Sequence, residues 1–106
     1  MKNEKISFIQ EKVSQEELLC QLAEEASELA HAALKLHRIY NGTNPTPTKR
    51  SDAFENLKEE IADVALLVYV CGLDKYFVEY GKTMTAKLDR WCNRLTAGER
   101  SAEDGK

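Results

Sequence analysis

The chain has 106 residues, a net charge of −3 and 31% charged residues, with only two prolines and five glycines. This length suits one domain, and the composition excludes collagen-like and disordered chains and favours helices. The acidic balance argues against a nucleic-acid partner, which ordinarily requires a basic patch. No stretch approaches the roughly 20 apolar residues of a membrane span, and the first ten residues lack the apolar segment of a signal peptide. We therefore expect residues 1–106 to form a single cytoplasmic domain that binds neither nucleic acid nor membrane.

The first predicted helix follows an N-terminal arm, residues 1–13. Ser14 with Glu17 three residues later is a capping box, so a helix is predicted from there to about Tyr40. Turn-forming and helix-breaking residues then fill the stretch to about Arg50, which predicts a loop.

A second helix is predicted to open at Ser51 or Asp52 and to stop at Gly72. A third begins near Asp74 and ends before Gly98, and residues 99–106 are expected to fray. These elements predict an all-α antiparallel bundle of three or four helices. Residues 65–70 are apolar nearly all round, which one small bundle cannot cover, so a homodimer or homotetramer is also predicted.

The three cysteines, Cys20, Cys71 and Cys92, are odd in number, far apart and without the spacing of metal ligands. Disulfides and a zinc site are therefore not expected. The cysteines are predicted to be packing residues.

Acidic residues interrupt the apolar stripes of the two long helices. The first stripe consists of Leu18, Leu22, Ala26, Leu29, Ala33 and Leu36. The second consists of Phe54, Leu57, Ile61, Val64, Leu67, Val68 and Cys71. On a helical wheel Glu25 projects about 20° from Leu18, Glu60 projects inside the second stripe, and Asp63 projects beside Val70. These acids are predicted to border or enter the core.

An unpaired carboxylate among apolar side chains costs several kcal/mol, so it must be protonated, salt-bridged or bound to a metal. For a single acid on a helix, ordinary solvation is the simpler interpretation. The matched pairs Glu25/Glu28 and Glu60/Asp63 on two antiparallel helices instead predict a cage of oxygen ligands. Such a cage suits Mg²⁺ or Mn²⁺.

The two pairs also resemble a known signature. Glu25-x-x-Glu28 within Glu-Glu-x-x-Glu-Leu-Ala, followed by Glu60-x-x-Asp63 within Glu-Glu-x-x-Asp-Val, looks like the metal-binding motif of the MazG-type all-α nucleoside triphosphate pyrophosphohydrolases. The resemblance runs from about residue 18 to residue 94. It implies an oligomeric, Mg²⁺-dependent enzyme that hydrolyses a nucleoside triphosphate to the monophosphate and pyrophosphate in nucleotide-pool housecleaning.

The resemblance also implies roles for individual residues. The four acids of the two motifs match magnesium ligands, while Glu24 and Glu59 match positions that orient water or an additional metal. In a metal-assisted mechanism, Glu24 or Glu59 is expected to accept the proton of the attacking water. Members of the family carry Lys-x-x-x-Asn-x-x-Arg on the last helix for substrate phosphates. Lys87 and Arg94 fit this pattern, but Trp91 stands where the asparagine would be.

The third helix has its own apolar stripe, made of Tyr76, Phe77, Tyr80, Met84, Leu88, Trp91 and Leu95. Lys87 and Arg94 lie at its margin, where they either bind phosphates or extend their charged ends to water. Trp91 either stacks on a base or packs in the core. Lys35, on nearly the same helix face as Glu28, either reaches phosphate or forms a salt bridge.

Two other functions stay open at this point. A non-enzymatic helical adaptor or regulatory module would bind another helix through an exposed apolar face. A phosphoribosyl-ATP pyrophosphatase would share the same resemblance and differ in its substrate. The preference for base and sugar does not follow from the sequence.

Overall fold

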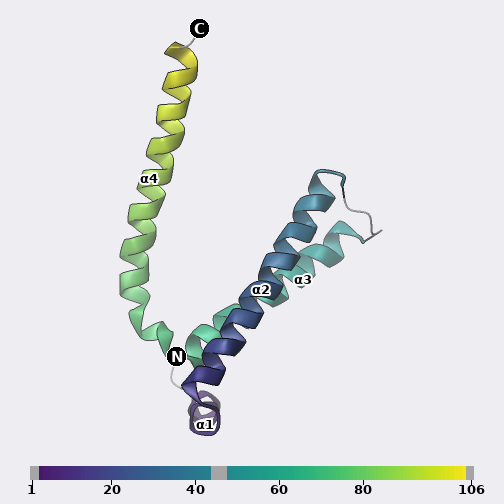
Figure 1. Ribbon diagram of the computed structural model, residues 1–106, viewed down its shortest axis with the longest axis vertical. Coiled ribbons are helices and arrows are strands. Elements are labelled where there is room, and N and C mark those ends of the chain that lie inside the picture. Colours follow the sequence, from purple (N-terminus) through teal and green to yellow (C-terminus); the bar gives the residue numbers. More distant parts are fainter. Residues whose placement is uncertain (1–2, 44–47, 105–106) are drawn as a thin grey trace. The chain divides into compact units, whose positions relative to one another are not determined.

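The computed structural model describes residues 3–43 and 48–104, and the regular structure in these ranges is entirely helical (Figure 1). The helices are α1 (Glu4–Lys12), α2 (Gln15–Tyr40), α3 (Arg50–Val70), the short 3₁₀ helix η1 (Leu73–Tyr76) and α4 (Phe77–Asp104). The prediction of an all-α protein is confirmed. No described helix combines the length and the apolar character needed to cross a bilayer. The chain divides into two compact units, Met1–Asp74 and Lys75–Lys106.

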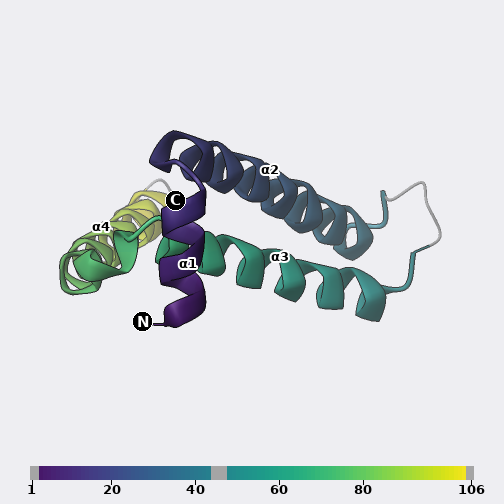
Figure 2. The same ribbon diagram turned by 90° about the horizontal axis from the view of Figure 1, so that it is seen from below.

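Helix α1 occupies most of the segment that was predicted as an arm, and this expectation is corrected. The side chain of Asn3 caps the helix by accepting a 2.8 Å hydrogen bond from the backbone N–H of Lys5. Ile6 is buried in a core cluster that includes Leu18 and Val70. Figure 2 shows α1 crossing one end of the α2–α3 pair. Residues 1–2 of the predicted arm lie outside the described residues.

Two glutamines bind the C-terminal end of α3. Gln10 of α1 donates from Nε2 to the carbonyl oxygen of Val70 at 3.0 Å, and Gln15 of α2 donates to that of Cys71 at 3.2 Å. The last carbonyls of a helix have no partner inside the helix, so these side chains supply one. Gly72 follows with φ of +73°, and α3 ends there as predicted.

Helix α2 begins as the capping box predicts. The Ser14 hydroxyl accepts a 3.1 Å hydrogen bond from the backbone N–H of Glu17. The helix ends at Tyr40, and Gly42 takes a φ of +75° in the turn that follows. Residues 44–47 of the predicted loop lie outside the described residues.

Helix α3 begins at Arg50, one residue before the predicted opening. Ser51 and Asp52 therefore lie in its first turn instead of capping it. Lys49 holds the cap position and makes no side-chain capping bond.

Helices α2 and α3 lie side by side and antiparallel (Figures 1 and 2). The residues between them recur at steps of four and three, and we call these two rows the seam. The seam on α2 is Leu18, Leu22, Glu25, Leu29, Ala32 and Leu36. The seam on α3 is Ala53, Leu57, Glu60, Val64, Leu67 and Cys71. Every seam residue is buried or half-buried, including the two glutamates.

The seam is narrower than the predicted apolar stripes. Ala26 and Ala33 of α2 are exposed, and Phe54 and Ile61 of α3 are 45% and 51% exposed, so their predicted burial is wrong. Each lies one residue after a seam position, about 100° further round its helix. A helix buries only the row that its neighbour covers, and this flank of the pair has no neighbour within the described part of Met1–Asp74.

Helix α4, in the second unit, continues through Gly98 to Asp104. The predicted stop at Gly98 is wrong, because an isolated glycine weakens a helix by only about 1 kcal/mol. The expected fraying is likewise corrected for residues 99–104, whereas residues 105–106 lie outside the described residues.

The apolar stripe predicted on the last helix is present but does not form a core within its own unit. Met84 is 63% exposed, and Leu88, Trp91 and Leu95 are each 60% exposed. At the start of the helix, the rings of Phe77 and Tyr80 meet edge to face with centroids 5.8 Å apart.

The three cysteines differ in their burial. Cys71 is buried in the seam, as the packing prediction requires. Cys20 and Cys92 are exposed, so the prediction is wrong for them.

Candidate functional site

Carboxylates from α2 and α3 converge at the middle of the seam. Glu25, Glu60 and Asp63 each place one oxygen within 4.8 Å of the others. Glu28 lies one turn after Glu25, and its negative charge contributes to the raised pKa of both Glu25 and Glu60. The structure therefore brings together the carboxylate oxygens of three of the four acids that were predicted as metal ligands, whereas Glu28 is exposed beside them, and the role of all four as ligands stays a prediction.

The helix period explains this convergence. Glu25 and Glu60 occupy seam positions, and Glu28 and Asp63 each follow three residues later, turned about 60° from the seam. Because the helices are antiparallel, this turn leads to the same side of the pair on both. We call this the acidic side, and it also carries Glu24.

The carboxylates of the two seam glutamates have no compensating partner among the residues that the structure describes. In the described ranges, Oε2 of Glu25 and Oε2 of Glu60 are shielded from solvent without a hydrogen-bond partner. Within the same ranges, no lysine or arginine forms an ion pair with these glutamates or with Asp63. A shielded, unpaired carboxylate is costly, so packing alone does not account for this cluster.

The electrostatics of the cluster raise two pKa values. Burial is the main cause of the raised pKa of Glu25, followed by the negative charges of Glu28, Asp63 and Glu60. Burial also raises the pKa of Glu60 most, followed by the charges of Glu28 and Asp63. The acids thus repel one another, and a bound cation would relieve that repulsion.

The donor set fits a hard divalent cation. The converging group contains carboxylate oxygens alone, which Mg²⁺ and Mn²⁺ prefer over the nitrogen and sulfur ligands of softer metals. The shielded oxygens without partners are the atoms that a cation would satisfy. Glu25, Glu60 and Asp63 are the residues that would hold it.

The predicted water-handling acids and one predicted substrate ligand flank the cluster. Glu24 and Glu59 each precede a seam glutamate and are exposed on the acidic side. Glu59 also contributes to the raised pKa of Glu60, while Glu24 accepts a 4.0 Å contact from the thiol of Cys20. Lys35 is half-buried, one residue before the seam position of Leu36. Lys35 therefore lies on the same row of α2 as Glu24 and Glu28, on the acidic side of the pair.

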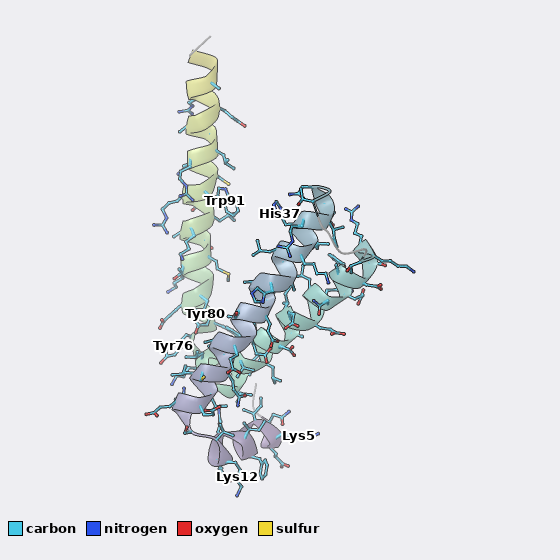
Figure 3. The ribbon with its side chains drawn as sticks, turned by 45° about the vertical axis from the view of Figure 1, so that its right-hand side comes forward. Lys5, Lys12, His37, Tyr76, Tyr80 and Trp91 are labelled. Atoms are coloured by element: carbon cyan, nitrogen blue, oxygen red, sulfur yellow. The ribbon has the colours of Figure 1, made fainter. Side chains whose placement is uncertain are left out.

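The remaining predicted substrate residues lie on α4. Lys87, Trp91 and Arg94 line one shallow surface depression, and Figure 3 shows the Trp91 side chain projecting from the helix. Arg90 and Asn93 line the same depression and were missed in the sequence. The i, i+3, i+7 spacing of Lys87, Arg90 and Arg94 was the signal that could have found Arg90. A role in substrate binding stays a prediction for all of them.

Comparison with known proteins identifies no relative. No family model, curated protein or solved structure matches the chain. The function proposed below therefore rests on the residues of the chain and on their geometry.

Proposed function

We propose that the protein is a metal-dependent hydrolase that splits a nucleoside triphosphate into the monophosphate and pyrophosphate. The main support is the pair of seam glutamates, Glu25 and Glu60, which carry shielded oxygens without partners in the described ranges. Acids at packing positions oppose stability, so a functional reason for them is favoured. The resemblance of the two motifs to the MazG-type signature supplies the reaction class.

The acids of the cluster would have separate tasks. Glu25, Glu60 and Asp63 would hold the cation, with Glu28 beside them. When bound, Mg²⁺ or Mn²⁺ neutralises phosphate charge and activates water. Glu24 or Glu59, exposed at the edge of the cluster, would accept the proton of the attacking water.

The substrate contacts belong to the same proposal. Lys87 and Arg94 would bind phosphate oxygens, because both offer exposed positive charge beside an aromatic ring. Trp91 would stack on the base, and the half-buried Lys35 would add a phosphate contact from α2. A homo-oligomer is also part of the proposal, because large apolar side chains on α3 and α4 are exposed.

The decisive experiment is an assay of the purified full chain against a panel of nucleotides, with pyrophosphate and phosphate detected separately. We expect pyrophosphate release with Mg²⁺ or Mn²⁺, little release with Ca²⁺, and none in excess chelator. Full turnover in chelator, or no hydrolysis of any nucleotide in the panel, would contradict the proposal. Including phosphoribosyl-ATP in the panel distinguishes the related pyrophosphatase activity.

A non-enzymatic adaptor is the second candidate, and the exposed stripe of α4 favours it. The two functions differ in their response to metal. A metal site stabilises the native state by mass action, so millimolar Mg²⁺ with a nucleotide should raise the melting temperature. An adaptor without a metal site should melt at the same temperature with and without them.

A further inference from the structure

Helix α2 ends at the sequence Asn41-Gly42-Thr43, which closes the helix with backbone hydrogen bonds. The N–H of Gly42 donates to the carbonyl oxygen of Ile39 at 3.3 Å. The N–H of Thr43 donates to the carbonyl oxygen of Arg38 at 2.9 Å. Both bonds satisfy carbonyls of the last turn that have no partner inside the helix. We call these two bonds, together with the side-chain bonds of Asn41, the cap of α2.

The side chain of Asn41 is held at both of its polar atoms. Its Oδ1 accepts hydrogen bonds from the backbone N–H of Thr43 at 3.2 Å and from the Thr43 hydroxyl at 2.6 Å. Its Nδ2 lies 3.3 Å from Nε2 of His37, and because an amide nitrogen only donates, the ring nitrogen accepts. Figure 3 labels His37 near this end of α2. All of these residues are exposed, so water reaches the cap.

An asparagine followed by glycine can react with its own backbone. The main-chain nitrogen of Gly42 attacks Cγ of Asn41 and loses its proton, the bond from Cγ to Nδ2 breaks, and ammonia leaves. Water then opens the resulting cyclic imide at one of its two carbonyl carbons, which gives aspartate or isoaspartate. Glycine favours the attack, because it has no Cβ and the space around its Cα is open. At Asn56 and Asn93 the next residue carries a side chain and the backbone is helical.

The cap opposes this reaction. Asn41 has a ψ of 5°, so the Gly42 nitrogen lies on the side of the Asn41 backbone nitrogen and is turned away from Cβ and Cγ. Attack requires rotation about ψ, and this rotation separates the N–H groups of Gly42 and Thr43 from the carbonyls that they bind. The last turn of a helix opens more readily than its middle. The reaction therefore proceeds from the open cap.

We propose that Asn41 is a site of spontaneous deamidation and that the cap of α2 sets its rate. The change is not reversed by reclosing, because isoaspartate adds a carbon to the main chain and alters the spacing of the cap bonds. A new carboxylate also lies at the negative end of the helix dipole, which disfavours the last turn. Asn41 follows Glu25 by about four turns, so this inference does not depend on the proposed hydrolysis.

The test follows the full chain over time at neutral pH, in chelator and without nucleotide. Mass spectrometry of digested samples locates the modified residue, and ion-exchange chromatography separates the more acidic product. We expect the folded chain to accumulate aspartate and isoaspartate at Asn41, with Asn56 and Asn93 unchanged. The same chain denatured in guanidinium chloride should convert Asn41 more than about tenfold faster, because no cap has to open.

Thr43→Val tests the cap directly. It removes the 2.6 Å hydroxyl bond and keeps the size and branching of the side chain. The folded variant should convert Asn41 about fivefold faster, and the Gly42 and Thr43-position amides should exchange hydrogen faster by a similar factor. The matched control is Thr85→Val, which removes a 3.0 Å hydroxyl bond to the carbonyl of Gly81 in α4 and should leave the rate at Asn41 unchanged.

Three results would overturn the proposal. The first is a folded chain in which Asn41 stays unmodified over weeks. The second is an equal rate in the folded and the denatured chain, which would remove the role of the cap. The third is a Thr43→Val rate at or below that of the wild type, because a slower variant would mean that the hydroxyl activates the amide carbonyl instead of protecting it.

Discussion

The α2–α3 pair and helix α4 use the same helical pattern to different ends. In the pair, apolar residues at steps of four and three meet a neighbour, and the seam buries Leu18 and Leu67 together with two half-buried glutamates. Helix α4 has a clear apolar stripe as well, yet Leu88 and Trp91 are each 60% exposed. Amphipathic spacing thus predicts a helix and its preferred face, but whether that face is buried depends on a partner.

The two regions also differ in the charged residues that they carry. The acids of the proposed metal site are in the pair, at positions where a carboxylate opposes packing. The basic residues Lys87 and Arg94 are on α4, where exposed charge costs little. Substitutions in the pair should therefore change activity and stability in opposite directions, whereas those on α4 should change activity alone.

The largest expected effect is that of Glu60→Gln. Removing a proposed ligand should reduce hydrolysis to below about 1% of the wild-type rate. In chelator the variant should melt at the same temperature as the wild type or higher, because one of several repelling charges is gone. Assays in Mg²⁺ and melting curves in chelator measure the two effects, with the exposed Glu55→Gln of the same helix as the control.

An active but strongly destabilised Glu60→Gln protein would contradict the metal interpretation. That result would mean that the carboxylate pairs with a cationic group and that its loss leaves this partner buried and uncompensated.

Lys87→Ala and Arg94→Ala should each lower kcat/KM about tenfold, since each removes one proposed phosphate contact. The melting temperature should not change, because both side chains are exposed. Steady-state kinetics measure the effect, with Lys82→Ala as the control. Lys82 is an exposed lysine of the same helix outside the depression, so its loss should leave kcat/KM unchanged. Wild-type kinetics in both variants would restrict the site to the acids of the pair.

A smaller effect is expected from pH. The folded chain raises the pKa of Glu25 and Glu60 above the ordinary 4.5, so it holds protons that the unfolded chain releases. Stability contributed by these groups therefore falls as the pH rises from about 4.5 through the raised values. Metal-free protein should melt at a higher temperature near pH 5 than near pH 7.5. Glu60→Gln should flatten this dependence, and an unchanged slope would show that the cluster does not repel.

The smallest effect is that of Gln10→Ala, which removes the 3.0 Å hydrogen bond to the carbonyl of Val70. We expect a loss of about 1 kcal/mol in unfolding free energy, measured by urea denaturation, with little change in hydrolysis. Glu11→Ala, an exposed change in the same helix, controls for helix propensity. Equal stability of the two variants would remove the role assigned to this bond.

Much of the fold follows from local signals in the sequence. The capping box at Ser14 places the start of α2, and Gly72 places the end of α3, because both act within a few residues. Helix α1 could also have been found, since Asn3 precedes Ile6 and Ile9 at helical spacing. Phe54 and Ile61 could not be placed, because their exposure depends on which side of α3 lacks a neighbour.

The candidate site was likewise predictable from the sequence only in part. The convergence of Glu25, Glu60 and Asp63 was predictable, since helix period and antiparallel pairing fix it. The two shielded oxygens without partners required coordinates, because solvent access to a single atom depends on every surrounding side chain. Three of the residues that line the depression on α4, Lys87, Trp91 and Arg94, were singled out from the sequence as substrate ligands, whereas Arg90 and Asn93 were not.

The seam also makes the α2–α3 pair a starting point for engineering. Leucine at both Glu25 and Glu60 would complete two uninterrupted rows of apolar residues at steps of four and three, the repeat of a two-stranded coiled coil. Such a chain should be a far more rigid scaffold than the natural one and unable to hold a cation. The difference in unfolding free energy between the two chains would measure how much fold stability the two seam glutamates cost.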